Sequence, residues 1–161
     1  MATFTKLLED RVLIKVGIKL LAGQFPERKL YAFPECWDWM RKVVPTLKTG
    51  TVGSDFTPQE QQIYRLRQWI AGLPIEHDRM FHDMKPHESG VWEMKTADLR
   101  YFGWMYRARE FVIARCGYAD DFKGDTKEKT YGAERDKVIQ LRDALPLDGE
   151  KMKEGTFYDL V

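Results

Sequence analysis

Residues 91–117 constrain the fold of this chain most, because they hold three β-rich segments joined by very short connections. The segments cover 91–95, 99–105 and 111–117 and are rich in Val, Ile, Phe, Tyr and Trp, which favour strands. Only a tight turn fits at Ala97 and Asp98, and a somewhat longer one fits at 106–110. Short connections join antiparallel neighbours, because a parallel crossover needs about a dozen residues or more. The stretch therefore predicts an antiparallel meander.

The first third of the chain predicts one further strand and one helix. Apolar and polar side chains alternate over residues 11–20, which predicts a strand. Residues 34–44 predict a helix that ends at Pro45, since acidic side chains precede basic ones as the helix dipole favours. Val12, Ile14, Val16 and Ile18 are expected to form one apolar face of this strand. The helix is expected to bury Trp37, Met40 and Val44.

Three further helices are predicted from start and stop signals. Thr57, Pro58 and Glu60 form a capping box, which predicts a helix that runs to Gly72. A shorter helix is predicted over 75–84, and a last one over 133–144, closed by Pro146. The remaining tail is polar, with Phe157 and Leu160 expected to dock back. Residues 46–56 predict an exposed loop.

Length and composition indicate one folded domain. The chain has 161 residues, 43% of them hydrophobic, which suits a single core. No apolar run approaches the roughly 18 residues of a membrane span, and the start lacks a signal-peptide pattern. Cys36 and Cys116 lie far apart without metal-ligand spacing, so buried free thiols are expected, with a disulfide left open. A cytoplasmic protein is therefore expected.

Charge gives no overall argument for a nucleic-acid partner. The chain carries 26 basic and 25 acidic side chains, whereas proteins that bind nucleic acids usually have a basic surplus. Basic residues nevertheless gather on the meander and the loop after it, interleaved with acidic ones, so the alternatives are a solvated, salt-bridged face and a phosphate-binding face. These basic residues are Lys95, Arg100, Arg107, Arg109, Arg115, Lys123, Lys127 and Lys129, and two tyrosines, Tyr118 and Tyr131, lie in the same part of the sequence.

Other chemistry is weakly indicated. His77, His82 and His87 are five apart, so they would not share a helix face, and no fourth ligand has zinc-site spacing. No phosphate-binding loop or hydrolase elbow motif occurs. Cys116 with His82 could form a nucleophile and base, although a cysteine on an apolar strand favours the core. The aromatic residues of the meander could stack bases, but core packing is favoured; they are Trp92, Tyr101, Phe102, Trp104 and Tyr106.

Three short motifs in this region resemble the RelE/HigB-like toxin superfamily, in its phage-derived branch. M-K-P-H at 84–87 and G-V-W-E-M-K at 90–95 resemble that branch's K-P-L…G-L-W-E-L-R run. D-L-R-Y-F at 98–102 is similar to its following D-x-R-x-F/Y strand, and F-V-I at 111–113 looks like its next strand. The resemblance covers about residues 58–145. It implies an α+β fold, with a curved antiparallel sheet of about four strands packed against N-terminal helices and a C-terminal helix.

The resemblance implies a single domain over 1–161, with an enlarged N-terminal part and a C-terminal tail at 146–161. It also implies a ribosome-associated endoribonuclease that cleaves mRNA without a metal or other cofactor and is neutralised by an antitoxin. Lys95 and Arg100 match the basic residues of the family's strands, and Lys123, Lys127 and Tyr131 fall near its C-terminal functional residues. The further basic residues expected to bind RNA are Arg107, Arg109, Arg115 and Lys129.

Two departures from the family leave an alternative open. The chain is near neutral, whereas the family toxins are usually strongly basic, and it is longer at both ends. A toxin-like fold can be kept while activity is lost. The alternative is a non-enzymatic protein of phage or mobile-element origin that binds and inhibits a host protein.

Overall fold

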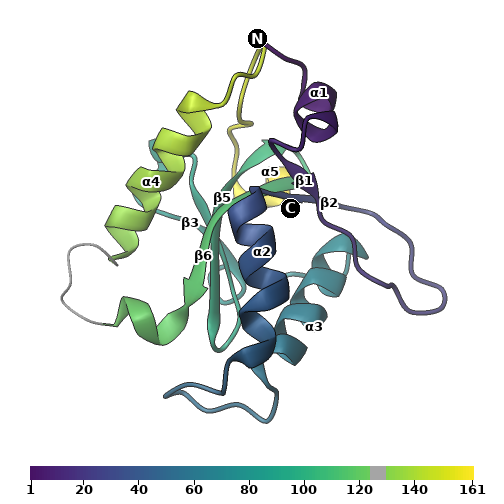
Figure 1. The fold of residues 1–161 in the computed structure, drawn as a ribbon, viewed down its shortest axis with the longest axis vertical. Coiled ribbons are helices and arrows are strands. Elements are labelled where there is room, and N and C mark those ends of the chain that lie inside the picture. The colour runs from purple at the N-terminus through teal and green to yellow at the C-terminus, as the bar shows by residue number, and fades with distance from the viewer. Residues whose placement is uncertain (124–129) are drawn as a thin grey trace.

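The three predicted strands form the centre of a six-stranded, open sheet in the computed structural model of the chain, which describes residues 1–123 and 130–161 (Figure 1). The class is α+β, as expected, but the sheet has six strands rather than about four. The order of strands across the sheet is β1-β2-β6-β5-β4-β3. Their bounds are β1 Ile14–Lys15, β2 Lys29–Ala32, β3 Phe81–Asp83, β4 Trp92–Lys95, β5 Leu99–Arg107 and β6 Glu110–Tyr118.

The pairing is antiparallel except between β2 and β6, which run parallel. The prediction of an antiparallel meander is confirmed for β4, β5 and β6. The strands β2 and β3 were missed, because each is very short and forms by pairing with a distant or neighbouring strand rather than by its own pattern. The predicted helix over 75–84 is wrong, since Phe81–Asp83 pairs with β4.

The predicted first strand is mostly wrong. Only Ile14–Lys15 pairs as a strand, against β2, and the chain leaves the sheet after Val16. Leu13, expected on the polar face, is fully buried against the second of two cores, whereas Val16 is buried in the first. The alternating pattern therefore reflects a segment that passes between two cores and contributes side chains to both.

The helices follow their sequence signals more closely. The capping box is present, with the Thr57 hydroxyl accepting from the Glu60 N–H and the Glu60 carboxylate accepting from the Thr57 N–H. The helix predicted over 34–44 is present but ends at Lys42, before a 3₁₀ turn that includes Pro45. Met40 and Val44 are buried as expected, whereas Trp37 is only partly buried. The first helix was not predicted. The bounds are α1 Phe4–Glu9, α2 Pro34–Lys42, α3 Pro58–Ile70, α4 Tyr131–Ala144 and α5 Phe157–Leu160, with 3₁₀ turns at Val44–Thr46, His87–Ser89 and Ala119–Phe122.

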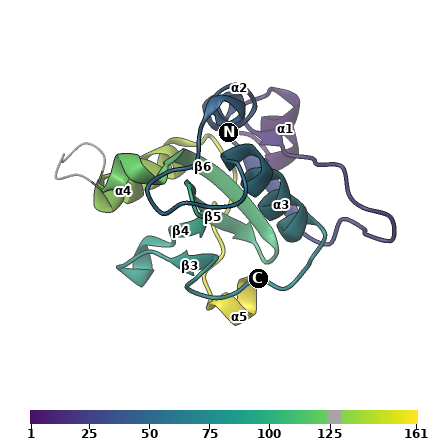
Figure 2. The same cartoon turned by 90° about the horizontal axis from the view of Figure 1, so that it is seen from below.

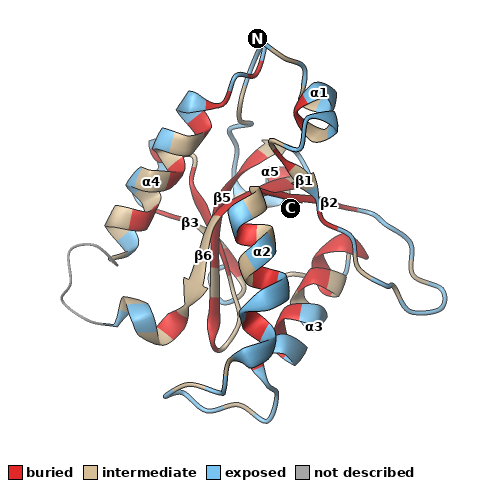
Figure 3. Cartoon of the chain, in the orientation of Figure 1, coloured by how far each residue is buried: buried red, intermediate tan, exposed pale blue. Residues whose placement is uncertain are grey.

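The helices cover the two faces of the sheet separately (Figures 1 and 2). On one face α2 and α3 enclose the first core, in which Trp69 packs against Phe81 and Phe111. On the other face α1 and α4 enclose the second core, around Phe102 and Trp104. The strands of the central sheet are accordingly buried, while the outer faces of the helices are exposed (Figure 3). Among the described residues, no helix is both long and apolar enough to cross a membrane.

Gly103 lies at the centre of the sheet, where the pairing of β5 with β6 slips by one residue. Phe102 pairs with Arg115, whereas Gly103 pairs with Ile113, so Ala114 forms a bulge. A Cβ on Gly103 would lie 1.7 Å from the Val112 carbonyl oxygen, which is closer than any real contact. This close approach of two backbones requires glycine.

The loop before α3 is fastened to the end of β6 by one carboxylate. Asp120 accepts hydrogen bonds from Lys123 at 2.8 Å, from the Thr51 N–H at 3.0 Å and from the Thr51 hydroxyl at 2.9 Å. These contacts, Lys123 first, lower the pKa of Asp120 to about 2. Because the folded-state pKa lies below that of the unfolded chain, this carboxylate contributes stability at pH above about 4, and the contribution disappears as the pH falls towards 2.

Asp120→Asn is therefore expected to lower the melting temperature at pH 6, and the difference from the unchanged protein is expected to shrink as the pH falls from 4 towards 2. Thermal melts followed by circular dichroism at several pH values measure it. Asp121→Asn is the control, because that neighbouring carboxylate makes no hydrogen bond within the described residues. A difference for Asp120→Asn that stays constant from pH 6 to pH 2 would contradict the role given to the carboxylate.

The C-terminal tail returns along the sheet after α4. Its start lies beside the N-terminus, with Ala2 donating to the Pro146 carbonyl. Further along, the Lys153 N–H donates to the Met105 carbonyl, and the Leu160 carbonyl accepts from the backbone N–H of Arg109. Leu160 is buried in the first core, as expected, and Phe157 packs against that core's edge. The tail therefore belongs to the folded domain.

Candidate active site

Three adjacent strands bring one acidic and three basic side chains together on the sheet face that α4 covers. His82 of β3 pairs directly with Glu93 of β4, and Lys95 of β4 pairs directly with Arg100 of β5. Alternate residues of a strand share a face, so Glu93 and Lys95 point to the same side, opposite to Trp92 and Met94. The register alone therefore places all four side chains next to one another.

Glu93 is the centre of this cluster. It is 4% exposed, and its two oxygens contact different partners: Oε2 lies 2.8 Å from His82 Nε2, and Oε1 accepts from Arg100 Nε at 3.2 Å. His82 Nδ1 lies 2.9 Å from the Asp83 carbonyl oxygen. Arg100 Nη1 also donates to the carbonyls of Thr96 and Leu99, at 2.6 and 2.9 Å. A buried carboxylate needs such partners, and here they fix the guanidinium in one orientation.

The cluster opens into a pocket of about 670 Å³, which we call the cation pocket. Tyr131, the first residue of α4, places its hydroxyl 3.4 Å from Arg100 Nε, while its ring packs against Phe102 and Phe122. Tyr131 is 37% exposed. The Lys95 ammonium also lines the pocket and pairs with no side chain of the described residues. Because α4 begins here, the positive end of its dipole lies at the same place.

The cation pocket can bind a phosphate and move a proton. It presents a fixed guanidinium, an unpaired ammonium and a phenolic hydroxyl, the groups that stabilise a negatively charged transition state and supply a proton to it. Among the described residues, no three His, Cys, Asp or Glu side chains are arranged to hold a metal ion. His77, His82 and His87 in particular do not converge as a metal site.

The structure thus brings together three of the nine residues predicted from the sequence: Lys95, Arg100 and Tyr131. Arg115 lies on the same face but is held by the buried Glu134, with Nε 2.8 Å from the carboxylate, and this hydrogen bond raises the pKa of Arg115. Lys123 is paired with Asp120. Lys127 and Lys129 lie outside the described residues.

The other two predicted RNA-binding residues lie at the far end of the β5–β6 hairpin. Arg107 stacks over the Tyr106 ring, with 4.2 Å from the guanidinium carbon to the ring centre, and donates to the Glu150 carbonyl. Arg109 occupies the hairpin turn with a positive φ of 65°. Neither lines the cation pocket.

His82 and Glu93 were not chosen from the sequence as site residues. The feature that marks them as site residues is the pairing of β3 with β4, which places a histidine beside a carboxylate on the face that also carries Arg100. That signal was hidden because the segment around His82 was predicted as a helix. A strand prediction at 81–83 would have revealed the cluster.

The other candidates from the sequence, the aromatic residues of the meander and Cys116, mainly pack in the two cores. Tyr101, Phe102 and Trp104 are fully buried, so they offer no surface for stacked bases, and Trp92 is 4% exposed. Cys116 lies in the first core, on the opposite face from His82, and does not pair with it. A hydrogen bond with Cys36, together with burial, raises the pKa of the Cys116 thiol well above its usual value. Both cysteines are free.

Comparisons with known proteins identify no relative: no known family, no curated protein and no solved structure matches the chain. The chemistry of the cation pocket is therefore the feature of the molecule that indicates a function.

Proposed function

We propose that the protein is a toxin-type endoribonuclease of the RelE/HigB-like kind, acting on mRNA at the ribosome without a metal. One observation carries the proposal: the Arg100 guanidinium, held by the buried Glu93, lies against the Tyr131 hydroxyl in an open pocket that also contains Lys95, whose ammonium pairs with no side chain of the described residues. The motif that resembles the toxin family supplies two of these residues, Lys95 and Arg100.

The proposed reaction is an internal transesterification of RNA. The ribose 2′-oxygen attacks the adjacent phosphorus and loses its proton to water, while the bond from phosphorus to the 5′-oxygen breaks. The leaving 5′-oxygen takes a proton. The products are a 2′,3′-cyclic phosphate and a 5′-hydroxyl, and no oxidant, metal or second substrate is needed.

Each residue of the pocket has a role in this reaction. Tyr131 donates the proton to the leaving oxygen and regains it from water. Arg100 and Lys95 stabilise the extra negative charge on the phosphoryl oxygens in the transition state. Glu93 and His82 do not contact RNA; they are positioning residues that orient Arg100, as the carboxylate of a catalytic triad orients its histidine.

The charge of the chain supports a substrate presented by the ribosome. Affinity for free nucleic acid grows with the number of phosphates that a protein neutralises, and the net charge here is only +1. With Lys85 and Arg135 at its edge, the pocket presents four Lys and Arg side chains, which can contact only a few phosphates of an RNA chain. A ribosome that holds the mRNA in place would supply the affinity that this surface lacks.

The test is cleavage of a defined mRNA by the purified protein in EDTA, with and without ribosomes. Cleavage to 2′,3′-cyclic phosphate ends is expected, faster with ribosomes. Lys95→Ala combined with Arg100→Ala is expected to reduce the rate by about 10²–10³-fold, since two charges that stabilise the transition state are lost. Lys95→Ala alone is expected to give part of this loss without disturbing the buried Glu93.

Arg41→Ala combined with Lys42→Ala is the matched control. These two cations lie on α2, over the opposite face of the sheet; within the described residues their ion pairs are with the exposed Asp38, and Arg41 also stacks over the Trp37 ring. The control is expected to cleave at the unchanged rate. RNA left intact both with and without ribosomes, while the protein co-purifies in equal amount with a host protein, would favour the non-enzymatic alternative and overturn the proposal.

A further inference from the structure

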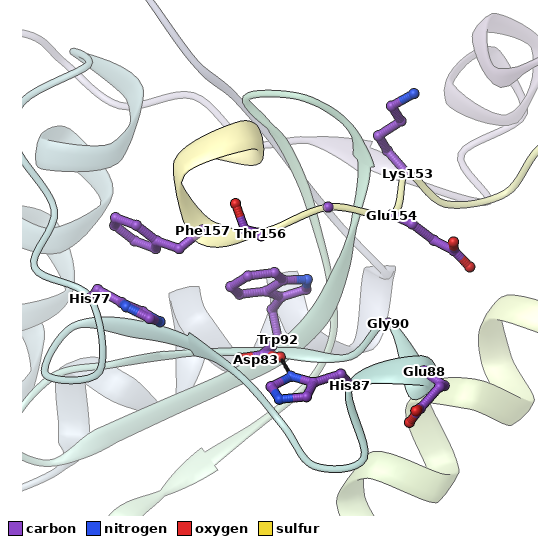
Figure 4. A pocket seen from close by; sticks show the side chains of 11 residues that line it. His77, Asp83, His87, Glu88, Gly90, Trp92, Lys153, Glu154, Thr156 and Phe157 are labelled. Carbon is purple, nitrogen blue, oxygen red and sulfur yellow. Dashed lines mark hydrogen bonds and ion pairs between the residues drawn. The ribbon is translucent and has the colours of Figure 1, made fainter.

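A second pocket lies on the other side of the edge strand β3, between that strand and the C-terminal tail (Figure 4). Its volume is about 520 Å³, within the range of small-molecule sites. Trp92 of β4 forms its floor, and the tail from Lys153 to Phe157 forms its outer wall. We call it the tail pocket.

Trp92 leaves one polar group of the tail pocket without a partner. The residue is 4% exposed, and its ring is stacked on Phe81 with 5.2 Å between ring centres. Its indole N–H makes no hydrogen bond within the described residues, unlike those of Trp69 and Trp104, which donate to carbonyls. Figure 4 shows the nitrogen on the side of the pocket where Lys153 and Glu154 lie. This N–H is not among the buried unpartnered polar atoms of the described residues, so it reaches the open space of the pocket, where it can donate to a ligand.

The walls of the tail pocket suit a planar, uncharged ring. The rings of His77 and Phe157 are stacked on each other, with 4.7 Å between their centres. They lie across the pocket from the exposed carboxylates of Glu88 and Glu154 (Figure 4). Glu88 and Glu154 make no ion pair within the described residues. The pocket is also lined by Lys153, and the carboxylates can accept hydrogen bonds from the amino group of a base. Aromatic walls in turn stack bases that are not paired.

The tail pocket borders the cation pocket. His77, Asp83 and His87 line both, and His87 Nδ1 contacts the Asp83 carboxylate at the rim between them. The two pockets lie on opposite sides of one strand at the edge of the sheet. Because the two pockets share this rim, a nucleotide chain that passes over it can place neighbouring parts in both pockets.

We infer that the tail pocket binds one unpaired nucleobase of the substrate RNA, with a preference for a base that carries an exocyclic amino group (adenine, guanine or cytosine) over uracil. This inference deepens the proposed function and rests on it for the identity of the chain that carries the base. The Trp92 N–H donates to a ring nitrogen or carbonyl oxygen of the base. Glu88 and Glu154 accept from its amino group, which uracil lacks.

The experiment observes binding directly, independently of cleavage. The Trp92 indole N–H signal is assigned in ¹⁵N NMR spectra by its absence from Trp92→Phe, and the full chain is titrated with adenosine, cytidine and uridine. Adenosine and cytidine are expected to shift this signal, and uridine is expected to bind about tenfold more weakly or worse. Dinucleotides with a 2′-O-methyl group, which cannot be cleaved, distinguish a base within a chain from a free nucleoside: they are expected to bind more tightly.

Two variants of α5 form a matched pair. Phe157→Ala removes a wall of the pocket and is expected to weaken binding about tenfold. Tyr158→Phe keeps the ring contacts with His77 and Phe157, changes only a residue that is 85% exposed and outside the pocket, and is expected to leave binding unchanged. No shift of the Trp92 signal with any nucleoside or dinucleotide would overturn the inference. Binding with the expected preference but without cleavage of any RNA would uphold the pocket and refute the proposed ribonuclease, so the two failures are distinct.

Discussion

Tyr131→Phe is expected to reduce RNA cleavage by about 10²–10⁴-fold, the usual contribution of a positioned proton donor. The change removes one oxygen and keeps the ring, which packs edge-on against Phe102 at 6.0 Å. Arg100 loses only its 3.4 Å contact with the hydroxyl and keeps Glu93 as its partner. Single-turnover cleavage of a ribosome-bound mRNA, together with a melting curve, separates the loss of chemistry from any loss of stability.

Tyr64→Phe is the matched control for the hydroxyl. Tyr64 lies on α3 and is 64% exposed, over the face of the sheet that the cation pocket does not share. The rate should be unchanged within experimental error. If Tyr131→Phe cleaves as fast as Tyr64→Phe, Tyr131 is not the proton donor, and the chemistry must be assigned to another group.

Gly103→Ala is expected to prevent folding. The added methyl would lie 1.7 Å from the Val112 carbonyl oxygen and 2.8 Å from its carbon, and both atoms are backbone of the central strand pair. Relief requires β5 and β6 to separate, and these strands contribute buried side chains to both cores. We expect a loss above about 4–5 kcal/mol, a large part of the 5–15 kcal/mol that stabilises a typical domain.

Gly17→Ala supplies the comparison, because a Cβ there meets no atom within 4 Å. We expect its stability to stay within about 1 kcal/mol of the unchanged protein, since alanine only restricts the unfolded chain. Urea unfolding followed by tryptophan fluorescence measures both variants. A Gly103→Ala protein that unfolds at nearly the same urea concentration would show that the sheet accommodates the methyl group.

The central meander and most helices could be predicted because their determinants are local. Strand-forming residues between short turns define β4 to β6, and the Thr57 capping box defines the start of α3. The start of α4 was placed two residues late, at 133 instead of Tyr131. The determinant is Thr130, whose hydroxyl accepts from the Ala133 N–H, and it was not recognised as the cap.

The edges of the sheet and half of the candidate site could not be predicted, because pairing creates them. Three residues at Phe81–Asp83 carry no pattern of their own and become a strand only against β4. The link between His82 and Glu93 depends on that register. By contrast, Lys95 and Arg100 face each other across a tight turn, so the sequence could place them side by side. Predictions from basic composition alone also selected Arg107 and Arg109, which lie at the other end of the hairpin.

The parallel pairing of β2 with β6 sets the order in which the chain can fold. Lys29 pairs with Glu110 and Ala32 with Ile113, so β2 must wait on a growing chain until β6 has been made. The hairpins of β4, β5 and β6 need only local contacts and are expected to form first, because closing short loops costs less entropy. The N-terminal segment, with the apolar side chains of Leu30 and Tyr31, then remains exposed until a late docking step. Folding of this domain during synthesis is therefore expected to be limited by its first strands, which emerge from the ribosome before the partner they require.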